Sequence, residues 1–492
     1  MAETVESLGA GLTRLASERP EAPAVICEGV RRSRSELHQD TNRLAHALAA
    51  RGVTRGDRVT VALPNSVEFV ELCWACWKLG ATPQPVSSRL PRHELDAVIA
   101  LAQPRVLVGA SGLDASMAVT TAAELNAESD DTRNLEDVVA PAWKAPTSGG
   151  STGRPKLIVA GQPGVVDAYG IGFWRFQPDD VAIMPGPLYH NGPFASAFTA
   201  MMAGVPLVLL PKFDPEAVLA AVERHRASWL YLVPTMMSRI WRLPEGDRLR
   251  HDVSSLRTVW HLGAPCPAWL KEAWIEWLGP DAIWELYAGT ESQAGTVING
   301  REWLQHRGSV GRVFYGQMKV LDDAGEEVPA GVEGEIYLRR NEGLPPSYRY
   351  LGAEAKDRDG WESLGDLGCF DADGYLYLSD RRSDMILVGG ANVYPAEVEA
   401  ALEEHPQVAS CAVIGLPDED IGNRIHAIVE SRGELDLDAL AAHLATRLLR
   451  YKLPRSFELS DHPLRDEAGK VRRSQLRAER LEPTNQQGNR SL

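Results

Sequence analysis

Glycines and hydroxyl residues gather ahead of a lysine at the end of the first third of the chain. Between Pro146 and Lys156 the sequence runs Thr147, Ser148, Gly149, Gly150, Ser151, Thr152, Gly153, Arg154, Pro155. Such a loop can aim several backbone N–H groups at one anion, which predicts a phosphate cradle. It is not a Walker A loop, because that motif needs Ser or Thr after a Gly-Lys pair. A plain surface turn would use the same residues, so the loop alone decides nothing.

Further groups of chemically useful residues follow the cradle in the chain. They are Tyr287-Ala288-Gly289-Thr290-Glu291, Gly360-Trp361 leading to Gly365-Asp366, Asp380-Arg381-Arg382-Ser383-Asp384, and Gly469-Lys470. Together with the cradle they resemble, in order and spacing, the signatures of the adenylate-forming superfamily. That superfamily comprises acyl-CoA ligases, adenylation domains of peptide synthetases and luciferases, and the resemblance runs from about residue 20 to residue 477.

The resemblance implies an ATP site with bound Mg²⁺. It gives Tyr287 the role of stacking on the base and Thr290 that of bonding a phosphate oxygen, while Glu291 holds the metal through oxygen. Two positions depart from the family pattern, since Ala288 and Leu157 stand where glycine is usual. An alanine would cost stability if its position required positive φ.

Other nucleotide contacts are carried over from the same resemblance. Gly263, Ala264 and Pro265 match the segment that packs on adenine, although a turn at the end of a strand would look the same. Asp366 matches the carboxylate that accepts both ribose hydroxyls, where a lone aspartate in a turn is usually a cap. Arg381 matches a further contact to the nucleotide hydroxyls.

The same resemblance also assigns residues to the acyl substrate and to the thiol acceptor. His190 matches a residue near the acyl carboxylate that gates the pocket, although a lone histidine is more often structural. Lys470 matches the C-terminal lysine whose charge steadies the developing carboxylate–phosphate bond. Gly389 and Gly390 leave room for a pantetheine arm, and a hairpin turn would use the same two glycines.

The activity that the resemblance implies is an acyl-CoA ligase using ATP, Mg²⁺ and CoA on a small-molecule carboxylic acid. Transfer to a separate acyl carrier protein is the alternative acceptor. A catalytically dead nucleotide-binding regulator is disfavoured because Lys470 and Glu291 are both present, and a luciferase-like oxygenase would share every motif. The run from Leu188 to Phe194 and the Gly-Gly-Ser-Thr cradle look most like ligases for bulky or polycyclic acids of the bile-acid type.

Composition sets limits on partners and compartment. The formal charge of −16 argues against nucleic acid or an anionic membrane as partner, because a polyanion would be repelled. The sequence contains no run close to the roughly 20 apolar residues that span a bilayer, and its first residues are acidic, so we expect a cytoplasmic protein. The sequence does not predict an oligomeric state. The Cys73 and Cys76 pair sits in an apolar segment, which indicates core thiols.

The elements that must position these motifs alternate between strand and helix, which predicts a mostly parallel sheet of the α/β class. We expect strands at 24–27, 59–62, 181–184, 229–233, 259–262 and 283–286, and helices at 6–19, 35–51 and 66–79. At 492 residues the chain is too long to fold around a single hydrophobic core, so we expect at least two domains. We predict an N-terminal domain of doubly wound sheets over 1–380, including a small β-barrel-like subdomain from 308 to 340. A hinge at 381–384, a small mobile α+β domain over 385–477 and a loose tail over 478–492 follow.

Overall fold

The computed structural model describes residues 6–109, 118–149, 155–418, 420–466 and 469–481. The chain divides into two compact units. The larger unit contains Met1–Met318, Leu338–Glu362 and Gly374–Leu376, and the smaller unit contains Lys319–Tyr337, Ser363–Asp373 and Tyr377–Leu492. Each unit is described by itself.

The larger unit opens with a parallel four-stranded sheet in the order β4-β3-β5-β6. Its strands are β3 (Arg58–Val61), β4 (Thr82–Pro85), β5 (Val106–Val108) and β6 (Ala118–Thr120). The helices of this region are α1 (Leu8–Glu18), α2 (Arg34–Ala50), α3 (Val67–Lys78), α4 (Arg92–Ala102) and α5 (Ala122–Glu128). The predicted strand at 59–62 and the three predicted helices are confirmed to within two residues at each end.

Helix α3 is buried along nearly its whole surface, and only Glu68 escapes. Cys73 and Cys76 are fully buried free thiols there, and burial raises the pKa of both. A thiol that cannot ionise is a poor redox group, so the prediction of core thiols is confirmed.

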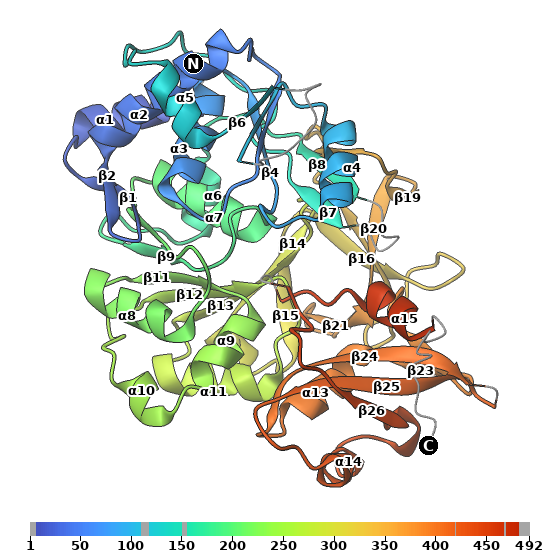
Figure 1. Ribbon diagram of the computed structural model, residues 1–492. Coiled ribbons are helices and arrows are strands. Elements are labelled where there is room, and N and C mark those ends of the chain that lie inside the picture. Colours follow the sequence, from blue (N-terminus) through green and yellow to red (C-terminus); the bar gives the residue numbers. More distant parts are fainter. Residues whose placement is uncertain (1–5, 110–117, 150–154, 419, 467–468, 482–492) are drawn as a thin grey trace, which may run out of the picture. The chain divides into compact units, whose positions relative to one another are not determined.

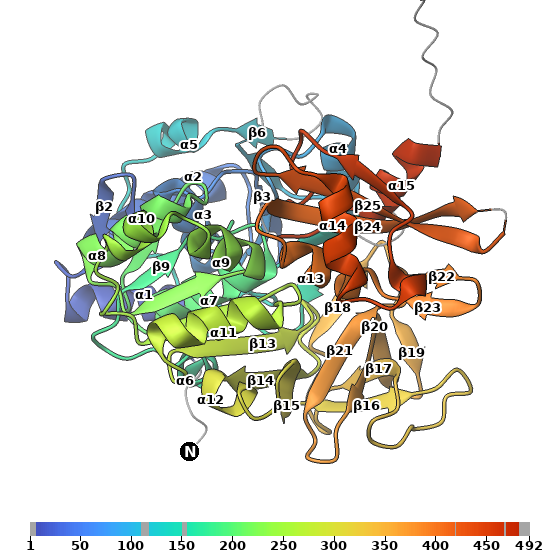
Figure 2. The same ribbon diagram turned by 90° about the horizontal axis from the view of Figure 1, so that it is seen from below.

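A second sheet in the larger unit carries the motif-bearing strands, in the order β15-β14-β13-β12-β11-β9-β10-β1-β2. From β13 to β1 neighbouring strands are parallel, and helices cover both faces, with α7 on one side and α8, α9 and α11 on the other (Figures 1 and 2). This is the doubly wound arrangement that the strand–helix alternation predicted. The strands are β1 (Pro23–Cys27), β2 (Val30–Ser33), β9 (Ala182–Met184), β10 (Leu207–Leu209), β11 (Trp229–Leu232), β12 (Thr258–Leu262), β13 (Ile283–Ala288), β14 (Gly295–Asn299) and β15 (Ser309–Tyr315).

The helices that accompany this sheet follow its strands in the usual crossover pattern. They are α6 (Ala168–Phe173), α7 (Asn191–Met202), α8 (Pro215–His225), α9 (Pro234–Trp241), α10 (Glu245–Leu249), α11 (Ala268–Leu278) and α12 (Gly300–Trp303). Helix α9 has proline in its first turn, where the missing N–H costs nothing.

The smaller unit contains an α+β layer built on a three-stranded sheet in the order β24-β25-β26. Its two faces are packed separately: Cys411 and Val413 belong to the core under α13 and α14, while Ala412 and Ile414 face a second cluster that includes Leu476 of α15. The elements of this layer are β22 (Ile386–Val388), β23 (Ala391–Val393), α13 (Pro395–Glu403), β24 (Val408–Asp418), β25 (Gly422–Ser431), α14 (Leu437–Ala445), β26 (Ser456–Leu459) and α15 (Arg473–Leu481). The smaller unit also holds most residues of β16 (Gln317–Leu321), β17 (Gly334–Arg339), β20 (Trp361–Phe370) and β21 (Leu376–Arg381).

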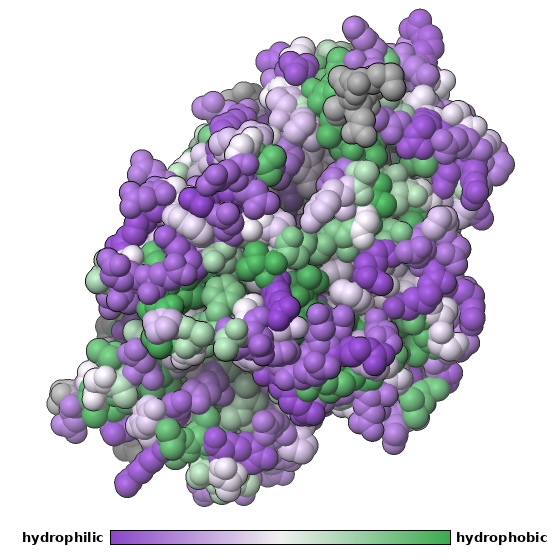
Figure 3. Space-filling view, turned by 180° about the vertical axis from the view of Figure 1, so that it is seen from behind, coloured by the Kyte–Doolittle hydropathy of each residue, from purple (hydrophilic) through white to green (hydrophobic). Residues whose placement is uncertain are grey.

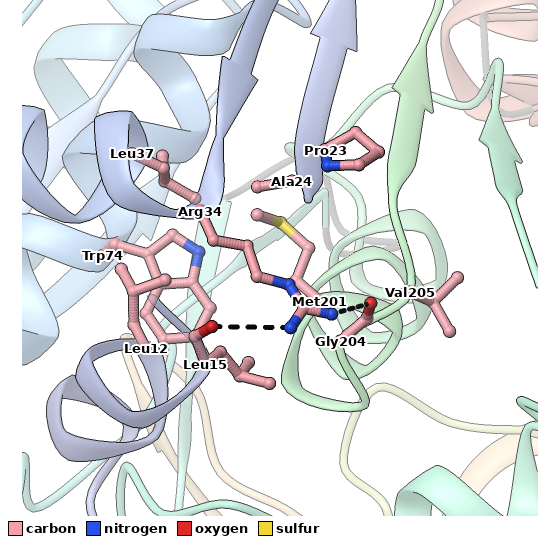
Figure 4. Close-up of a pocket in the computed structure, with 10 residues that line it drawn as sticks. All are labelled: Leu12, Leu15, Pro23, Ala24, Arg34, Leu37, Trp74, Met201, Gly204 and Val205. Carbon is pink, nitrogen blue, oxygen red and sulfur yellow. Dashed lines mark hydrogen bonds between the residues drawn. The ribbon is translucent and has the colours of Figure 1, made fainter. Parts of the chain in front are cut away.

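A small cavity in the larger unit lies among α1, α2, α3 and the segment after α7 (Figure 4). The Arg34 guanidinium crosses it and donates to the carbonyl oxygens of Leu15, at 3.4 Å, and Gly204, at 2.7 Å. Arg34 therefore joins the end of α1 to the turn after α7. The cavity contains none of the predicted site residues, so it belongs to the packing of the helical layer.

Hydrophilic and hydrophobic residues are interspersed on the face drawn in Figure 3. Within the described parts of the chain, every helix is too short or too polar to cross a membrane.

Candidate active site

The cradle is built as a β-hairpin. Strands β7 (Thr147–Gly149) and β8 (Pro155–Ala160) pair antiparallel, with Ser148 opposite Lys156. Thr147, Ser148 and Gly149 therefore lie on a strand, while Gly150, Ser151, Thr152 and Gly153 fall outside the described residues. A third strand, β18 (Tyr348–Leu351), pairs with the other edge of β8.

Lys156 and Glu291 are brought together although they lie far apart in the sequence. The Lys156 ammonium is 3.5 Å from Oε1 of Glu291, whose side chain is only 7% exposed. The Tyr350 hydroxyl donates to the same Oε1, and the Lys156 ammonium lies 4.0 Å from the centre of the Tyr350 ring. A lysine, a carboxylate and a phenol at the mouth of a glycine-rich hairpin can hold phosphate oxygens and a divalent cation.

Tyr350 was not predicted as a site residue. Burial, followed by the charge of Glu291 and the hydrogen bond to it, raises the pKa of Tyr350, so the phenol keeps its proton and stays a donor. Tyr348, two residues earlier on the same strand face, donates to Glu362, which also accepts from Gln293. The alternation of two tyrosines in an otherwise polar stretch was the available signal in the sequence.

The predicted base-binding residues follow neighbouring parallel strands. Leu262 at the end of β12 pairs with Leu286 on β13, so Gly263 and Tyr287 emerge at the same edge of the sheet. Ligands of open α/β sheets bind at this carboxyl edge. Gly263 has φ of +86°, a left-handed conformation that favours glycine.

Ala288 carries no backbone strain. It lies in β13 opposite Gly295, and the left-handed residue in this segment is Ser292, with φ of +53°. The cost that positive φ would have imposed on an alanine therefore does not arise. Leu157, the other departure from the family pattern, is fully buried on β8 and packs with Val86 and Leu107.

A buried lysine that the sequence did not suggest lies beside the predicted gate. His190 is the residue just before α7, and its ring is 4.5 Å from that of Tyr189. The next residue, Asn191, accepts a hydrogen bond from the buried ammonium of Lys144. Burial lowers the pKa of Lys144 to about 7, although the charge of Glu291 acts to raise it. The group is thus a base that can change its charge near neutrality.

Five bulky aromatic residues, of a kind that could line an acyl pocket, all lie in the core. Each is less than 7% exposed: Trp174, Phe194, Trp229, Tyr231 and Trp260. The Trp174 carbonyl accepts from the indole N–H groups of Trp229 and Trp260, at 2.8 and 3.3 Å, which satisfies two buried donors. The structure favours the packing interpretation for these residues.

The smaller unit holds the predicted ribose pair. Asp366 on β20 accepts a hydrogen bond from Nε of Arg381 at the end of β21, at 3.2 Å. The Asp366 side chain is 14% exposed and that of Arg381 is 58% exposed. A carboxylate with a guanidinium beside it can recognise a vicinal diol.

The remaining predicted residues of the smaller unit lie in turns. Gly389 and Gly390 join β22 to β23 and both have positive φ, 56° and 85°, as a two-residue hairpin turn requires. Turn geometry alone therefore explains both glycines, and their role towards CoA stays a prediction. Ser383 donates to Asp384 at 3.2 Å, and Lys470 is exposed, with its backbone N–H bonded to Asp466 at 2.8 Å.

The fold, with its two sheets and its small α+β layer, is that of the adenylate-forming enzymes. The sequence profile of the AMP-binding enzyme family matches residues 12–348, and the profile of the AMP-binding enzyme C-terminal domain matches residues 397–470. The chain belongs to the AMP-binding enzyme family.

Similar proteins of known name cover nearly the whole chain. A feruloyl-CoA synthase from an Amycolatopsis species is 33% identical over 495 residues, covering 96% of this chain and 99% of that protein. The long-chain-fatty-acid–CoA ligase FadD13 of Mycobacterium tuberculosis is 31% identical over 504 residues, covering 96% and 98%. The O-succinylbenzoate coenzyme A synthetase (MenE) of Bacillus subtilis, solved with ATP and magnesium ion, is 27% identical with a TM-score of 0.80, covering 95% and 98%.

Proposed function

We propose that this chain activates a bulky carboxylic acid with ATP and Mg²⁺ and passes the acyl group to the thiol of CoA. The class of reaction follows from the family: the chain is an AMP-forming acid–thiol ligase. A feruloyl-CoA synthase among the relatives supports a bulky acid as the substrate, so aromatic acids of the ferulate type are the first candidates. Polycyclic acids of the bile-acid type come second.

The observation that carries the proposal is the contact of Lys156 and Glu291 beside the cradle hairpin. A lysine 3.5 Å from a nearly buried carboxylate brings a cationic donor and an oxygen ligand together, and such a pair can hold phosphate oxygens and a cation. Glu291 offers the hard oxygen ligand that Mg²⁺ prefers, and Lys156 would pair with a phosphate oxygen. When bound, Mg²⁺ would neutralise charge on the phosphates and so ease departure of pyrophosphate.

In the first half reaction an oxygen of the substrate carboxylate bonds to the α-phosphorus of ATP while the bond from that phosphorus to pyrophosphate breaks. The cradle residues and Lys156 would hold the leaving pyrophosphate, with Thr290 on a phosphate oxygen. Gly263, Ala264, Pro265 and Tyr287 would hold adenine, and Asp366 and Arg381 the ribose. Lys470 would steady the oxygens between the acyl group and phosphorus, where charge develops, and His190 would stand at the acyl carboxylate.

In the second half reaction the CoA sulfur bonds to the acyl carbon, and AMP leaves with the bonding electrons. We place the boundary between the two catalytic domains at residues 380 and 381, with 381–384 as the hinge and Ser383 as the pivot. A rotation there would withdraw Lys470 and present Gly389 and Gly390 to the pantetheine arm. ATP and CoA as substrates make the cytoplasm the proposed compartment.

The test is product analysis over a panel of acids with ATP and Mg²⁺, with CoA present or absent. We expect AMP, pyrophosphate and an acyl-CoA thioester from ferulate-like or polycyclic acids. Thioester from short linear acids alone would contradict the proposed bulk. If an acyl carrier protein discharges the acyl adenylate and CoA does not, the carrier protein is the acceptor in place of CoA.

A further inference from the structure

The loop that carries Lys470 is anchored at both ends by arginines that share one buried carboxylate. Glu399, on α13, has a side chain only 7% exposed. Its Oε2 accepts from Nη2 of Arg465 at 2.9 Å, and both of its oxygens accept from Nη2 of Arg473, at 2.8 and 2.9 Å. Arg465 precedes Lys470 and Arg473 follows it, so one carboxylate closes the loop.

Arg465 extends this anchor to the peptide next to the lysine. Its Nη1 donates to the carbonyl oxygen of Gly469 at 3.2 Å. Asp466 closes the turn from the other side, because its backbone N–H donates to the Lys470 carbonyl oxygen at 2.9 Å and its carboxylate accepts from the Lys470 N–H at 2.8 Å. The backbone at Gly469 and Lys470 is thus held by the Arg465 guanidinium on one side and by Asp466 on the other.

The anchor is attached to a rigid element, the edge strand β24. Glu399 accepts from the backbone N–H of Val413 at 2.9 Å, and Arg465 donates to the carbonyl oxygen of Cys411 at 3.1 Å. Both backbone groups lie on β24, which ends the sheet order β24-β25-β26. Burial alone would raise the pKa of Glu399, but the two guanidiniums and the Val413 N–H outweigh it and the pKa lies below its ordinary value.

Arg473 also reaches the segment predicted as the hinge. Its Nη1 donates to Oδ2 of Asp384 at 2.7 Å, and Asp384 accepts from the Ser383 hydroxyl. The same arginine therefore contacts the base of the lysine loop through Glu399 and the end of the 381–384 segment through Asp384.

We propose that Glu399 is a positioning residue for Lys470, which holds the lysine loop in the one geometry that the adenylation step requires. This inference rests on the proposed function, in which Lys470 serves adenylation and is withdrawn during thioester formation. Glu399 does not touch the reacting atoms. It acts through Arg465 and Arg473, so its loss should impair one half reaction and spare the other.

A merely structural cluster would behave differently. Removing one partner of a buried ion network destabilises the fold around it, which would slow both half reactions alike. The two half reactions are therefore measured separately. Adenylation is followed as acid-dependent pyrophosphate release, and thioester formation is followed from a synthetic acyl adenylate and CoA.

For Glu399→Gln we expect adenylation to fall between about tenfold and 100-fold, with transfer from the synthetic adenylate retained. Lys470→Ala should give the same split, more strongly. Glu399→Asp keeps the charge and should recover part of the adenylation rate. The matched control is Glu397→Gln on the same helix, whose carboxylate pairs with Lys452 at 2.6 Å on the surface, and it should leave both rates unchanged.

Amide hydrogen exchange gives a readout that does not depend on catalysis. The N–H groups of Gly469 and Lys470 both donate to Asp466, so a peptide covering this loop should exchange faster in Glu399→Gln and normally in Glu397→Gln. Equal loss of both half reactions, or unchanged exchange in the loop, would overturn the inference. A wild-type protein that forms no adenylate with any acid would instead refute the proposed function, whatever the exchange shows.

Discussion

Glu291 has two neighbours that fix its direction, and both contact the same oxygen. Lys156 and the Tyr350 hydroxyl meet at Oε1. Under the proposed function the other oxygen, Oε2, would be the metal ligand. Groups that orient a metal ligand in this way set its affinity almost as much as the ligand itself does. Tyr350 is thus the residue through which strand β18 supports the proposed metal site.

Removal of the Tyr350 hydroxyl should raise the Mg²⁺ concentration needed for half-maximal adenylation by about 10-fold to 100-fold in Tyr350→Phe. The measurement is a Mg²⁺ titration of acid-dependent pyrophosphate release at saturating ATP. Tyr451→Phe is the control, because that tyrosine is 44% exposed and its loss of a hydroxyl should leave the titration unchanged. Equal Mg²⁺ requirements in the two variants would show that Tyr350 does not orient Glu291.

Lys144 makes the stability of the larger unit depend on pH. Its pKa is about 7 in the folded chain and about 10.5 when exposed, so from pH 7 to pH 10.5 the unfolded chain binds a proton that the folded chain has released. In that window the free energy of unfolding of the wild type should rise, relative to Lys144→Met, by up to about 1.4 kcal/mol per pH unit. Below pH 7 both states are protonated and the difference should be constant.

Urea unfolding of both proteins between pH 6 and pH 9.5 measures this difference. Parallel stability curves over the whole range would mean that Lys144 keeps its ordinary pKa in the fold.

Sequence patterns identified Lys156 and Glu291 because each belongs to a local motif. They could not identify Tyr350 or Lys144, since their contacts arise only when distant segments pair: β18 with β8, and the segment before β7 with the start of α7. The five buried aromatics show the same limit, because a core residue and a pocket residue follow the same apolar pattern.

At the scale of elements, the strands and helices around the motifs could be predicted to within about two residues because their apolar periodicity is strong. The cradle was harder to place. Its flanking strands are short and hydroxyl-rich, and the partner strand β18 lies nearly 200 residues later in the sequence. Only the assembled three-stranded sheet shows that Leu157, where the family resemblance predicts glycine, is a core residue.

Leu157 is a core residue of that sheet, so Leu157→Ala should lower the free energy of unfolding by about 2–5 kcal/mol. The side chain is fully buried and contacts the layer that contains Val86 and Leu107. The comparison variant is Leu344→Ala, whose side chain is 52% exposed and should change stability by less than about 0.5 kcal/mol. Chemical denaturation gives both numbers, and similar values for the two would contradict the packing described here.

At the scale of the whole molecule, the predicted residues fall into two separate sets. Lys156, His190, Gly263, Tyr287 and Glu291 belong to the larger unit, while Asp366, Arg381, Gly389 and Lys470 belong to the smaller one. A rotation at the proposed hinge, 381–384, would move Gly389 and Lys470 of the second set, while the phosphate and metal residues stay in place. The family resemblance predicted two domains with a boundary at residues 380 and 381, which stays a prediction. Apolar periodicity alone could not have suggested it, because it reports only local elements.

The central claim is that a carboxylate oxygen of the acid bonds to the α-phosphorus of ATP. The most direct measurement uses an acid labelled with ¹⁸O in its carboxylate, either ferulate or another acid of the panel that reacts. The mass of the nucleotide product is then determined by mass spectrometry. The account predicts AMP that carries one ¹⁸O atom, because the acyl–oxygen bond breaks when the thiol attacks. Label in inorganic phosphate, with ADP as the nucleotide product, would contradict it.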